Sequence, residues 1–226
     1  MRSHSQSRSS RSKGSKEVNA QDKELPQQLL PRGFAGRLAF VLMNRGHKSI
    51  YENVAKVLAL QPEDDILEVA CGDGYFLKKY SSHVHSVSGL DHSELAVKLA
   101  MNKNKGRVEA GTAEFVRGDA SQLPFEDNKF SVATTMASIM YFPKPLEALK
   151  EMHRVLRIGG RLVACIEWNA EDGKDHSKSV KKHGMHLWKE GDVRHMLEEA
   201  QFSDIAITYA KGLMMPRMMV VRGVKR

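Results

Sequence analysis

The sequence predicts an α/β fold with a doubly wound, mostly parallel sheet and an antiparallel C-terminal strand. From residue 34 onward, short apolar runs of strand length alternate with segments whose apolar residues recur at helical spacing. This alternation implies βαβ crossovers, in which helices join the strands of a parallel sheet. Two further apolar runs, at 205–209 and 214–221, follow the last predicted helix, and we expect the antiparallel strand at this end of the chain.

The first two elements of the predicted domain are helices. Residues 34–44 and 49–60 both carry apolar side chains at helical spacing. Ser49 is placed to cap the second helix, because Glu52 follows it by three residues, as in a capping box.

The strands of the sheet and their connecting helices follow in order. The predicted strands are the short apolar runs at 66–70, 84–90, 114–117, 130–135 and 160–167. The predicted helices between or after them lie at 72–80, 93–102, 145–156 and 189–200. In such a sheet the ligand site lies at the carboxyl ends of the strands, near the point where the strand order reverses.

The first 33 residues are predicted to lie outside the folded domain. Residues 1–17 hold five basic residues and one acidic residue, a balance of +4 that is half of the formal net charge of +8. They also hold seven serines and no apolar side chain apart from Met1, so they cannot offset the entropy of folding. We therefore predict a disordered basic tail and linker over 1–33 and one domain over 34–226. The alternative is that the basic tail is an arm that attracts nucleic acid, but we favour a tail that is simply solvated.

The composition indicates a soluble protein of a reducing compartment. Hydrophobic residues make up 41% of the chain, enough for a buried core, and no apolar run approaches the roughly 18 residues of a membrane span. The two cysteines, Cys71 and Cys165, form no CxxC pair, which argues against a disulfide framework or a cysteine zinc site. We expect a cytoplasmic protein with no metal.

The first motif lies at the end of the first predicted strand. Gly72 and Gly74 permit a tight turn and a close approach of a ligand to the backbone. The helix that follows presents free N–H groups to that ligand. Glu68 makes the pattern more specific, because a carboxylate at the end of a buried strand is costly unless a cationic or N–H-rich ligand partners it.

Two aspartates end the next two strands. Asp91 lies 23 residues after Glu68, close to the offset of about 20 residues at which an acid binds ribose hydroxyls in nucleotide-binding βαβ units. We favour that role over a helix N-terminal acid. Asp119, in Gly118-Asp119-Ala120, can accept a hydrogen bond from an adenine amino group, while a simple turn residue is an equal alternative.

Together these residues resemble the class I S-adenosylmethionine-dependent methyltransferases, and within them the small-molecule group that includes ubiquinone/menaquinone C-methyltransferases. The resemblance covers about residues 34–210. Its motifs are ILEVACGDG at 66–74, Asp91, the adenine motif at 118–120, LPFEDNKF at 123–130 and EALKEMHRVLRIGGRL at 147–162. It implies a Rossmann-like methyltransferase sheet, S-adenosyl-L-methionine as cofactor, and methyl transfer to a small-molecule acceptor.

The resemblance also implies roles for individual positions. Glu68 would organise the methionine end of the cofactor, and Asp91 would hold its ribose. The backbone of the first motif would pass beneath the cofactor at Ala70, Cys71, Gly72 and Gly74. The adenine would lie beside His92, Asp119 and Ala120, while Thr135 and Met136 would lie near the amino group and the sulfonium.

The sequence departs from the family pattern at several positions. Ala70 stands where the first glycine is usual, Ser131 replaces a common aspartate, and Ile158 replaces the usual proline. Tyr141 stands where many relatives have histidine, so no catalytic base carries over from them. Cys71 is interpreted as a structural turn residue, because no neighbouring base that would lower its pKa is recognisable.

Weak candidates for a general base are Tyr141, His47 and His186. A place in an N-terminal lid over the cleft is one interpretation of His47, and a surface histidine is the favoured one. A metal site from His183, His186 and Glu190 is not favoured. An apolar acceptor pocket and ordinary core packing are alternative roles for Met185, Trp188, Met214 and Met215.

Two other functions stay open on the sequence. One is methylation of RNA or protein, with the basic tail as an electrostatic arm, although no Asn-Pro-Pro-aromatic motif follows the fourth strand. The other is a non-catalytic module that binds S-adenosylmethionine without turnover. A dinucleotide oxidoreductase is disfavoured, because Leu77 stands where the third glycine of GxGxxG is required.

Overall fold

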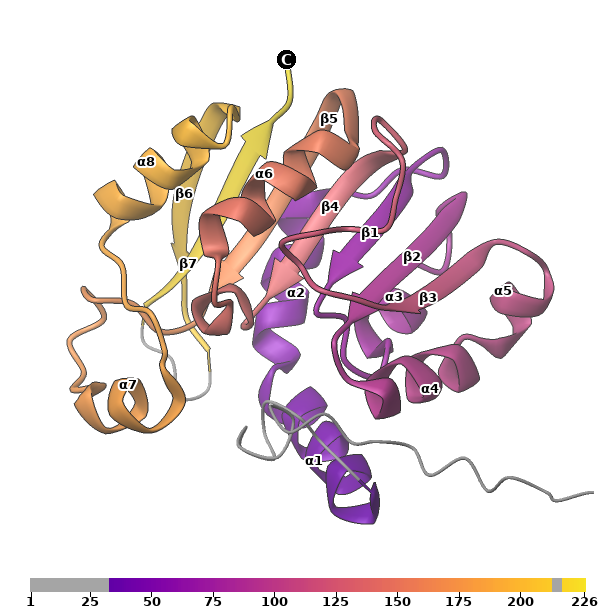
Figure 1. Cartoon of the computed structure of the whole chain (residues 1–226), viewed down its shortest axis with the longest axis horizontal. Coiled ribbons are helices and arrows are strands. Elements are labelled where there is room, and N and C mark those ends of the chain that lie inside the picture. Colours follow the sequence, from indigo (N-terminus) through magenta and orange to yellow (C-terminus); the bar gives the residue numbers. More distant parts are fainter. Residues whose placement is uncertain (1–32, 213–216) are drawn as a thin grey trace, which may run out of the picture.

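The fold is a seven-stranded sheet with helices on both faces (Figure 1). The computed structural model describes residues 33–212 and 217–226, so the predicted tail lies almost wholly outside the described residues. The strands are β1 (Asp65–Val69), β2 (Ser86–Asp91), β3 (Ala113–Arg117), β4 (Phe130–Met136), β5 (Leu156–Ile166), β6 (Ser203–Ala210) and β7 (Met218–Val224). Their order in the sheet is β3-β2-β1-β4-β5-β7-β6.

The strand directions confirm the predicted fold class. β3, β2, β1, β4 and β5 pair in parallel, and β7 runs antiparallel to both of its neighbours, β5 and β6. The strand order reverses between β1 and β4, so the switch point of the sheet lies at the carboxyl ends of these two strands.

Two apolar clusters cover the two faces of the sheet. The helices are α1 (Gly33–Gly46), α2 (Lys48–Leu58), α3 (Tyr75–Tyr80), α4 (Glu94–Lys103), α5 (Lys105–Glu109), α6 (Pro145–Val155), α7 (Ser177–His183) and α8 (Glu190–Glu199), with a 3-10 turn, η2, at Ile139–Tyr141. Apolar side chains of α2, α3 and α4 form one cluster with the sheet, and those of α6 and α8 form the other. Within the described ranges, no helix is long and apolar enough to cross a membrane.

The start of the second helix differs from the prediction. α2 begins at Lys48, with His47 as its N-cap residue and no side-chain cap. Ser49 therefore lies inside the first turn, and its buried hydroxyl has no hydrogen-bond partner. Because only His47 separates α1 from α2, α2 begins one residue before Ser49, and Ser49 is not its N-cap residue. The predicted Ser49–Glu52 capping box is therefore wrong. By contrast, Ser93 does cap α4, accepting a hydrogen bond from the Ala96 N–H at 3.3 Å.

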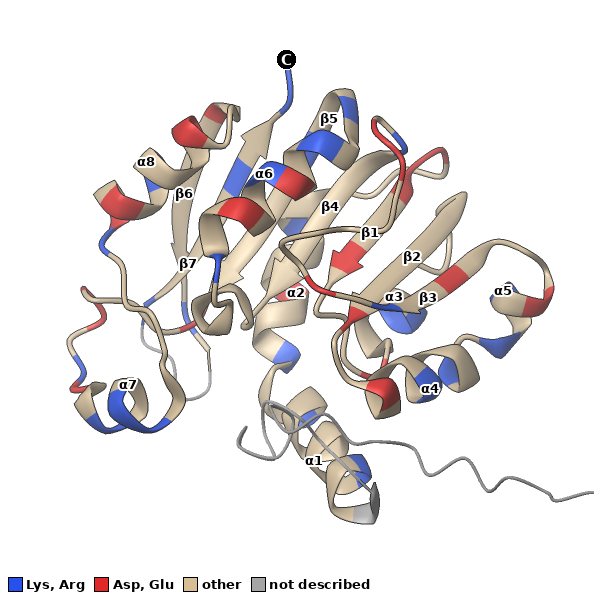
Figure 2. Cartoon of the chain, in the orientation of Figure 1, with Lys and Arg blue, Asp and Glu red and all other residues tan. Residues whose placement is uncertain are grey.

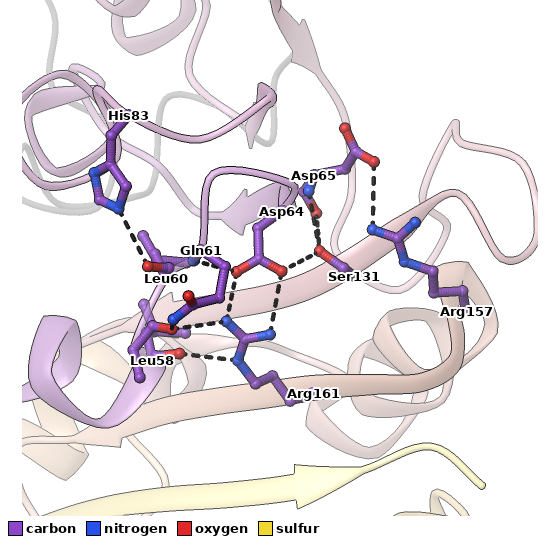
Figure 3. A network of polar contacts seen from close by, with 10 residues as sticks. Leu58, Leu60, Gln61, Asp64, Asp65, His83, Ser131, Arg157 and Arg161 are labelled. Carbon is purple, nitrogen blue, oxygen red and sulfur yellow. Dashed lines mark hydrogen bonds and ion pairs between the residues drawn. The ribbon is translucent and has the colours of Figure 1, made fainter.

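A buried ion pair joins the amino end of β1 to β5 and α2 (Figure 3). Arg161 donates to both carboxylate oxygens of Asp64, at 2.6 and 3.2 Å, and to the Leu58 carbonyl at 2.9 Å. Ser131 donates to Asp64 at 2.6 Å and accepts from the Asp65 N–H at 3.0 Å. Ser131, which departs from the family pattern, thus links β4 to the amino end of β1, at the end of the sheet opposite the strand carboxyl ends.

Candidate functional site

A cavity of about 900 Å³ lies at the carboxyl ends of the parallel strands. Its volume is within the range of about 300–1,000 Å³ that small-molecule and cofactor sites occupy. Most of the predicted site residues line it, namely His47, Ala70, Gly72, Asp91, His92, Asp119, Ala120 and Tyr141. Figure 2 shows acidic residues at the carboxyl ends of β1 and β2, where the predicted motifs lie.

The turn after β1 brings its backbone to the cavity. Ala70 and Gly72 both have positive φ, at 60° and 54°, and both line the cavity. The Gly72 N–H donates to Asp91 Oδ2 at 2.9 Å, and the Cys71 N–H donates to the Leu90 carbonyl at 3.0 Å. These bonds tie the turn to the end of β2, so the two predicted motifs form one structure.

Gly74 and Cys71 lie behind that turn. A Cβ atom at Gly74, whose φ is 70°, would lie only 2.8 Å from Asn104 Nδ2 and 2.9 Å from the Ala100 side chain. This glycine therefore allows α3 and α4 to pack closely. Burial, followed by the nearby charges of Asp91 and Glu68, raises the pKa of the Cys71 thiol. A thiol held neutral in this way is a poor nucleophile, in keeping with a structural role.

Replacing Ala70 with glycine should stabilise the protein by about 0.5–1 kcal/mol. A left-handed backbone costs an L-residue about 1–2 kcal/mol, and glycine avoids this cost. Glycine also has greater freedom in the unfolded chain, which lowers stability by about 0.4–1 kcal/mol and offsets part of the gain. The matched control is Ala120→Gly, since Ala120 lines the same cavity without a positive φ and should lose stability. Urea unfolding of the three proteins measures the difference, and an Ala70→Gly variant no more stable than the parent would contradict the strain at this position.

Asp91 is held rigidly at the cavity edge. The residue is 6% exposed, and its Oδ1 accepts from the Ser93 N–H at 2.9 Å while Oδ2 accepts from Gly72. Burial raises the pKa of Asp91, although the His92 charge and the backbone N–H donors oppose the shift. Each carboxylate oxygen can accept a further hydrogen bond, so the side chain is oriented in advance for a hydroxyl ligand.

Asp119 is a turn residue that also lines the cavity. The Ser121 N–H and hydroxyl both donate to Asp119 Oδ1 at 2.8 Å, which makes it a turn residue, and the same residue lines the cavity. The Ser121 N–H is the main cause of its lowered pKa. Beside it, the Arg117 guanidinium donates to the His92 carbonyl at 2.9 Å, which joins the ends of β2 and β3.

Glu68 lies beneath the cavity and does not line it. The residue is 4% exposed, and its Oε2 has no hydrogen-bond partner. Burial, together with the charges of Asp73 and Asp91, raises the pKa of this carboxyl well above its usual range. Because burying this carboxyl is costly, the sequence pattern predicts that a ligand partners it, and within the protein its Oε2 has no partner.

The end of β4 differs from the predicted positions. Thr135 and Met136 are buried within the strand and do not line the cavity. Ala137 and Ser138, which follow them, do line it, and Ala137 has a φ of 53°. The chain turns into the cavity only after β4 has ended, and the sequence could not place that turn to within two residues.

The three weak catalytic candidates separate in the structure. Tyr141 and His47 line the cavity, whereas His186 does not. The His186 ring stacks on Trp188 with ring centroids 5.5 Å apart, and the backbone N–H of His186 donates to the Met140 carbonyl at 2.8 Å. His183, considered only as a metal ligand on the sequence, lines the cavity instead.

The proposed acceptor-pocket residues belong to different surroundings. Met185 is 3% exposed and lies in the apolar core, and Trp188 packs against that core. Met214 and Met215 lie outside the described residues. Among the residues that the structure describes, no group of three His, Cys, Asp or Glu side chains is arranged to hold a metal ion.

Sequence reasoning missed Glu167, which lines the cavity just beyond β5. It is 6% exposed, and its Oε2 accepts no hydrogen bond. Burial raises its pKa to about 7, although a hydrogen bond from Trp168 opposes the shift. The signal was present in the sequence, because Glu167 ends an apolar strand just as Asp91 does. No family motif drew attention to it.

The comparisons with known proteins agree with this geometry. A family model described as a methyltransferase domain matches residues 67–164. The chain is 35% identical over 134 residues to a demethylmenaquinone methyltransferase of Staphylococcus epidermidis, an alignment covering 58% of this chain and 54% of that one. The chain thus spans about half the length of the curated relatives it matches.

Solved structures share the fold. One comes from a complex between the Haloferax volcanii Trm112 methyltransferase activator and a putative methyltransferase, with a TM-score of 0.71, 18% identity, and coverage of 80% of this chain and 90% of that one. Another is Haemonchus contortus phosphoethanolamine N-methyltransferase 2 in complex with S-adenosyl-L-methionine, with a TM-score of 0.67, 14% identity, and coverage of 78% and 52%. Residues 67–164 therefore match the methyltransferase-domain family, and the chain shares its fold with these methyltransferase structures.

Proposed function

We propose that this protein transfers the methyl group of S-adenosylmethionine to a small-molecule acceptor. The observation that carries the proposal is a single cavity that brings together the turn after β1, Asp91 after β2 and Asp119 after β3. At the switch point of an α/β sheet, a nucleoside ligand requires the backbone of a turn, an acid that binds its ribose and an acid that binds its adenine.

The residues at the β1, β2 and β3 ends fit the cofactor. Asp91 would accept hydrogen bonds from the ribose hydroxyls, and Asp119 with Ala120 would bind the adenine beside His92. Ala70 and Gly72 would pass their backbone beneath the cofactor. The buried, unpartnered Glu68 Oε2 would orient the methionine end through the turn or a water molecule.

The remaining predicted contacts are proposed in modified form. Cys71 and Gly74 would support the turn from behind, while Thr135 and Met136 would form the buried base beneath Ala137 and Ser138. When bound, S-adenosylmethionine supplies a methyl group already activated by its sulfonium. The chain itself has to position an acceptor in line with that group and keep water out, and positioning alone can supply much of the rate enhancement.

A small, largely apolar acceptor suits the rest of the cavity. Phe40, Met43, Phe142 and Pro143 give the cavity an apolar lining beside its polar groups. The relatives at 34–35% identity are named demethylmenaquinone methyltransferases, which makes demethylmenaquinone in its reduced, hydroquinone form the first acceptor to test. Cys71 and Cys165 are both buried free thiols, which supports a cytoplasmic location for the activity.

Calorimetry and methyl labelling test this proposal. We expect heat of binding with S-adenosylmethionine and none with NAD, whereas no heat with either ligand would overturn the cofactor assignment. Incubation with methyl-labelled cofactor and a fractionated cell extract should then place label in the small-molecule fraction. Label in RNA or protein would favour a macromolecular acceptor, and binding without label transfer would favour a non-catalytic module.

Truncation of residues 1–33 separates the two acceptor classes further. We expect the truncated protein to label small molecules as well as the full chain does, because the tail would contribute only to an electrostatic attraction for nucleic acid. A loss of labelling in the truncated protein, with S-adenosylmethionine binding retained, would favour the nucleic-acid reading.

A further inference from the structure

The cavity contains an acid–histidine pair that cofactor binding does not explain. His47 joins α1 to α2, and Glu167 follows the end of β5. Both residues line the cavity, and His47 Nε2 lies 3.5 Å from Glu167 Oε2. The two side chains are 19% and 8% exposed. Segments 120 positions apart in the chain are thus brought together at one end of the cavity.

The pair is poorly compensated electrostatically. In residues 33–212 and 217–226, His47 is the only basic side chain within 4 Å of the Glu167 carboxylate, and Oε2 accepts no hydrogen bond. Trp168, Tyr141 and Cys165 are the other polar or titratable groups that interact with Glu167, and His183 lines the same cavity. A buried carboxylate with so few donors is costly, and such groups often mark functional sites.

The position of the pair matches the place where an acceptor would bind. The aspartates proposed to bind the cofactor follow β2 and β3, whereas Glu167 follows β5. Four strand spacings separate β3 from β5 in the sheet order, about 19 Å at the usual spacing between strands. A nucleoside bound over β2 and β3 therefore leaves the β4–β5 end, with Tyr141 and the pair, free for a second molecule.

We propose that His47 and Glu167 act together as the general base of the methyl transfer and take a proton from a hydroxyl group of the acceptor. This inference rests on the proposed function and assigns the base of the same site. The apolar part of the acceptor would contact Phe40, Met43 and Phe142, with its hydroxyl group directed toward the pair.

The proton balance of the step is simple. The nucleophilic atom of the acceptor forms a bond to the methyl carbon as the carbon–sulfur bond of the donor breaks, and that electron pair remains on sulfur. The hydroxyl proton passes to the pair, which changes from one negative charge to neutral and later releases the proton to water.

The protonation states at neutral pH suit this role. Burial lowers the pKa of His47, so its imidazole is neutral, while burial raises the pKa of Glu167 to about 7. Glu167 is thus partly ionised at neutral pH, and a base performs best when its pKa lies near the working pH. Tyr141 is no competing base, because burial and the Glu167 charge raise its pKa to about 12.

Histidine NMR on the full chain tests the pair without any ligand. Of the ten histidines, His47 is assigned by the signal that disappears in His47→Gln. We expect this signal to show an inflection near pH 7 that is lost in Glu167→Gln and kept in Glu126→Gln, a control at an exposed loop position. The same His47 titration in the parent and in Glu167→Gln would overturn the pairing.

The pH–rate profile tests the catalytic role. With methyl-labelled S-adenosylmethionine and the small-molecule fraction of the cell extract, Glu167→Gln should lower the maximal rate about 100-fold, the usual scale of a lost general base. It should also remove the rise in rate between about pH 6 and pH 8, while calorimetric affinity for S-adenosylmethionine stays within about twofold of the parent. His47→Gln should behave similarly, and His195→Gln, at an exposed position on α8, should not.

The possible failures are distinguishable. Absence of S-adenosylmethionine binding, or of any label transfer by the parent protein, would overturn the proposed function itself. Normal transfer by Glu167→Gln with an unchanged pH profile would overturn only the base assignment. A folded Glu167→Gln variant that loses cofactor affinity in parallel with rate would show a structural role instead, and Glu167→Asp should then fail to restore the pH profile.

Discussion

Replacing Asp91 with alanine should weaken S-adenosylmethionine binding at least tenfold. A hydrogen bond to a charged group contributes about 1.5–3 kcal/mol, and each 1.4 kcal/mol corresponds to a tenfold change in affinity. The structure adds a second cause, because Asp91 also accepts hydrogen bonds from the Gly72 and Ser93 N–H groups. Without the carboxylate, the turn after β1 would lose the Gly72 bond to the end of β2 and keep the bond from the Cys71 N–H to the Leu90 carbonyl.

Calorimetric titration of two variants separates these causes. Asp91→Asn retains one carbonyl oxygen, so it should keep part of the backbone bonding and lose less affinity than Asp91→Ala. Asp204→Ala is the matched control, since Asp204 lies in β6 at the far edge of the sheet and pairs with Arg226. A folded Asp91→Ala variant with parental affinity would remove this residue from the cofactor site.

Replacing Asp64 with alanine should lower the free energy of unfolding by about 3 kcal/mol. Removing one partner of a buried ion pair costs about 3–5 kcal/mol, because the other charge is left uncompensated. Arg161, whose side chain is 19% exposed, would keep its bond to the Leu58 carbonyl, so we expect the lower end of that range. Ser131 and the Gln61 N–H would also lose an acceptor.

A surface ion pair provides the comparison for Asp64. Asp127 pairs with Arg154 at 2.7 Å, but its side chain is 67% exposed. Asp127→Ala should therefore cost no more than about 1 kcal/mol in urea unfolding, the usual range for exposed pairs. Equal losses in the two variants would show that burial of the Asp64 pair does not determine its contribution.

The Asp64 pair should also affect stability in acid. Burial opposes ionisation of Asp64, but hydrogen bonds from Arg161, Ser131 and Gln61 outweigh it and lower the pKa. A carboxyl whose pKa is lower in the folded state stabilises the protein above its ordinary pKa of 3.8, and this contribution disappears as pH falls through the lowered value. The difference in stability between parent and Asp64→Ala should thus shrink below about pH 4.

Local patterns were sufficient for the fold and for most of the cofactor end of the cavity. Apolar periodicity predicted the helices and strands, because helical and extended segments bury side chains with different repeats. The Gly72 turn, Asp91 and Asp119 were predicted because each follows a strand directly, and parallel strands end at the same edge of the sheet. Chain position alone therefore brings these residues together, whatever the details of packing.

Contacts between distant segments were decided by the tertiary structure. The sequence places His47 and Glu167 120 positions apart and cannot show that the α1–α2 junction lies over the end of β5. It likewise favoured His186 over His183 as a candidate base, although only His183 faces the cavity. The turn after β4 also begins at Ala137, after the predicted Thr135 and Met136. Strand order and helix packing bring such residues together, and neither is encoded in local spacing. The sequence by itself thus determined the fold class and the residues at the β1–β3 end of the cavity, and the tertiary structure decided which side chains meet at its β4–β5 end.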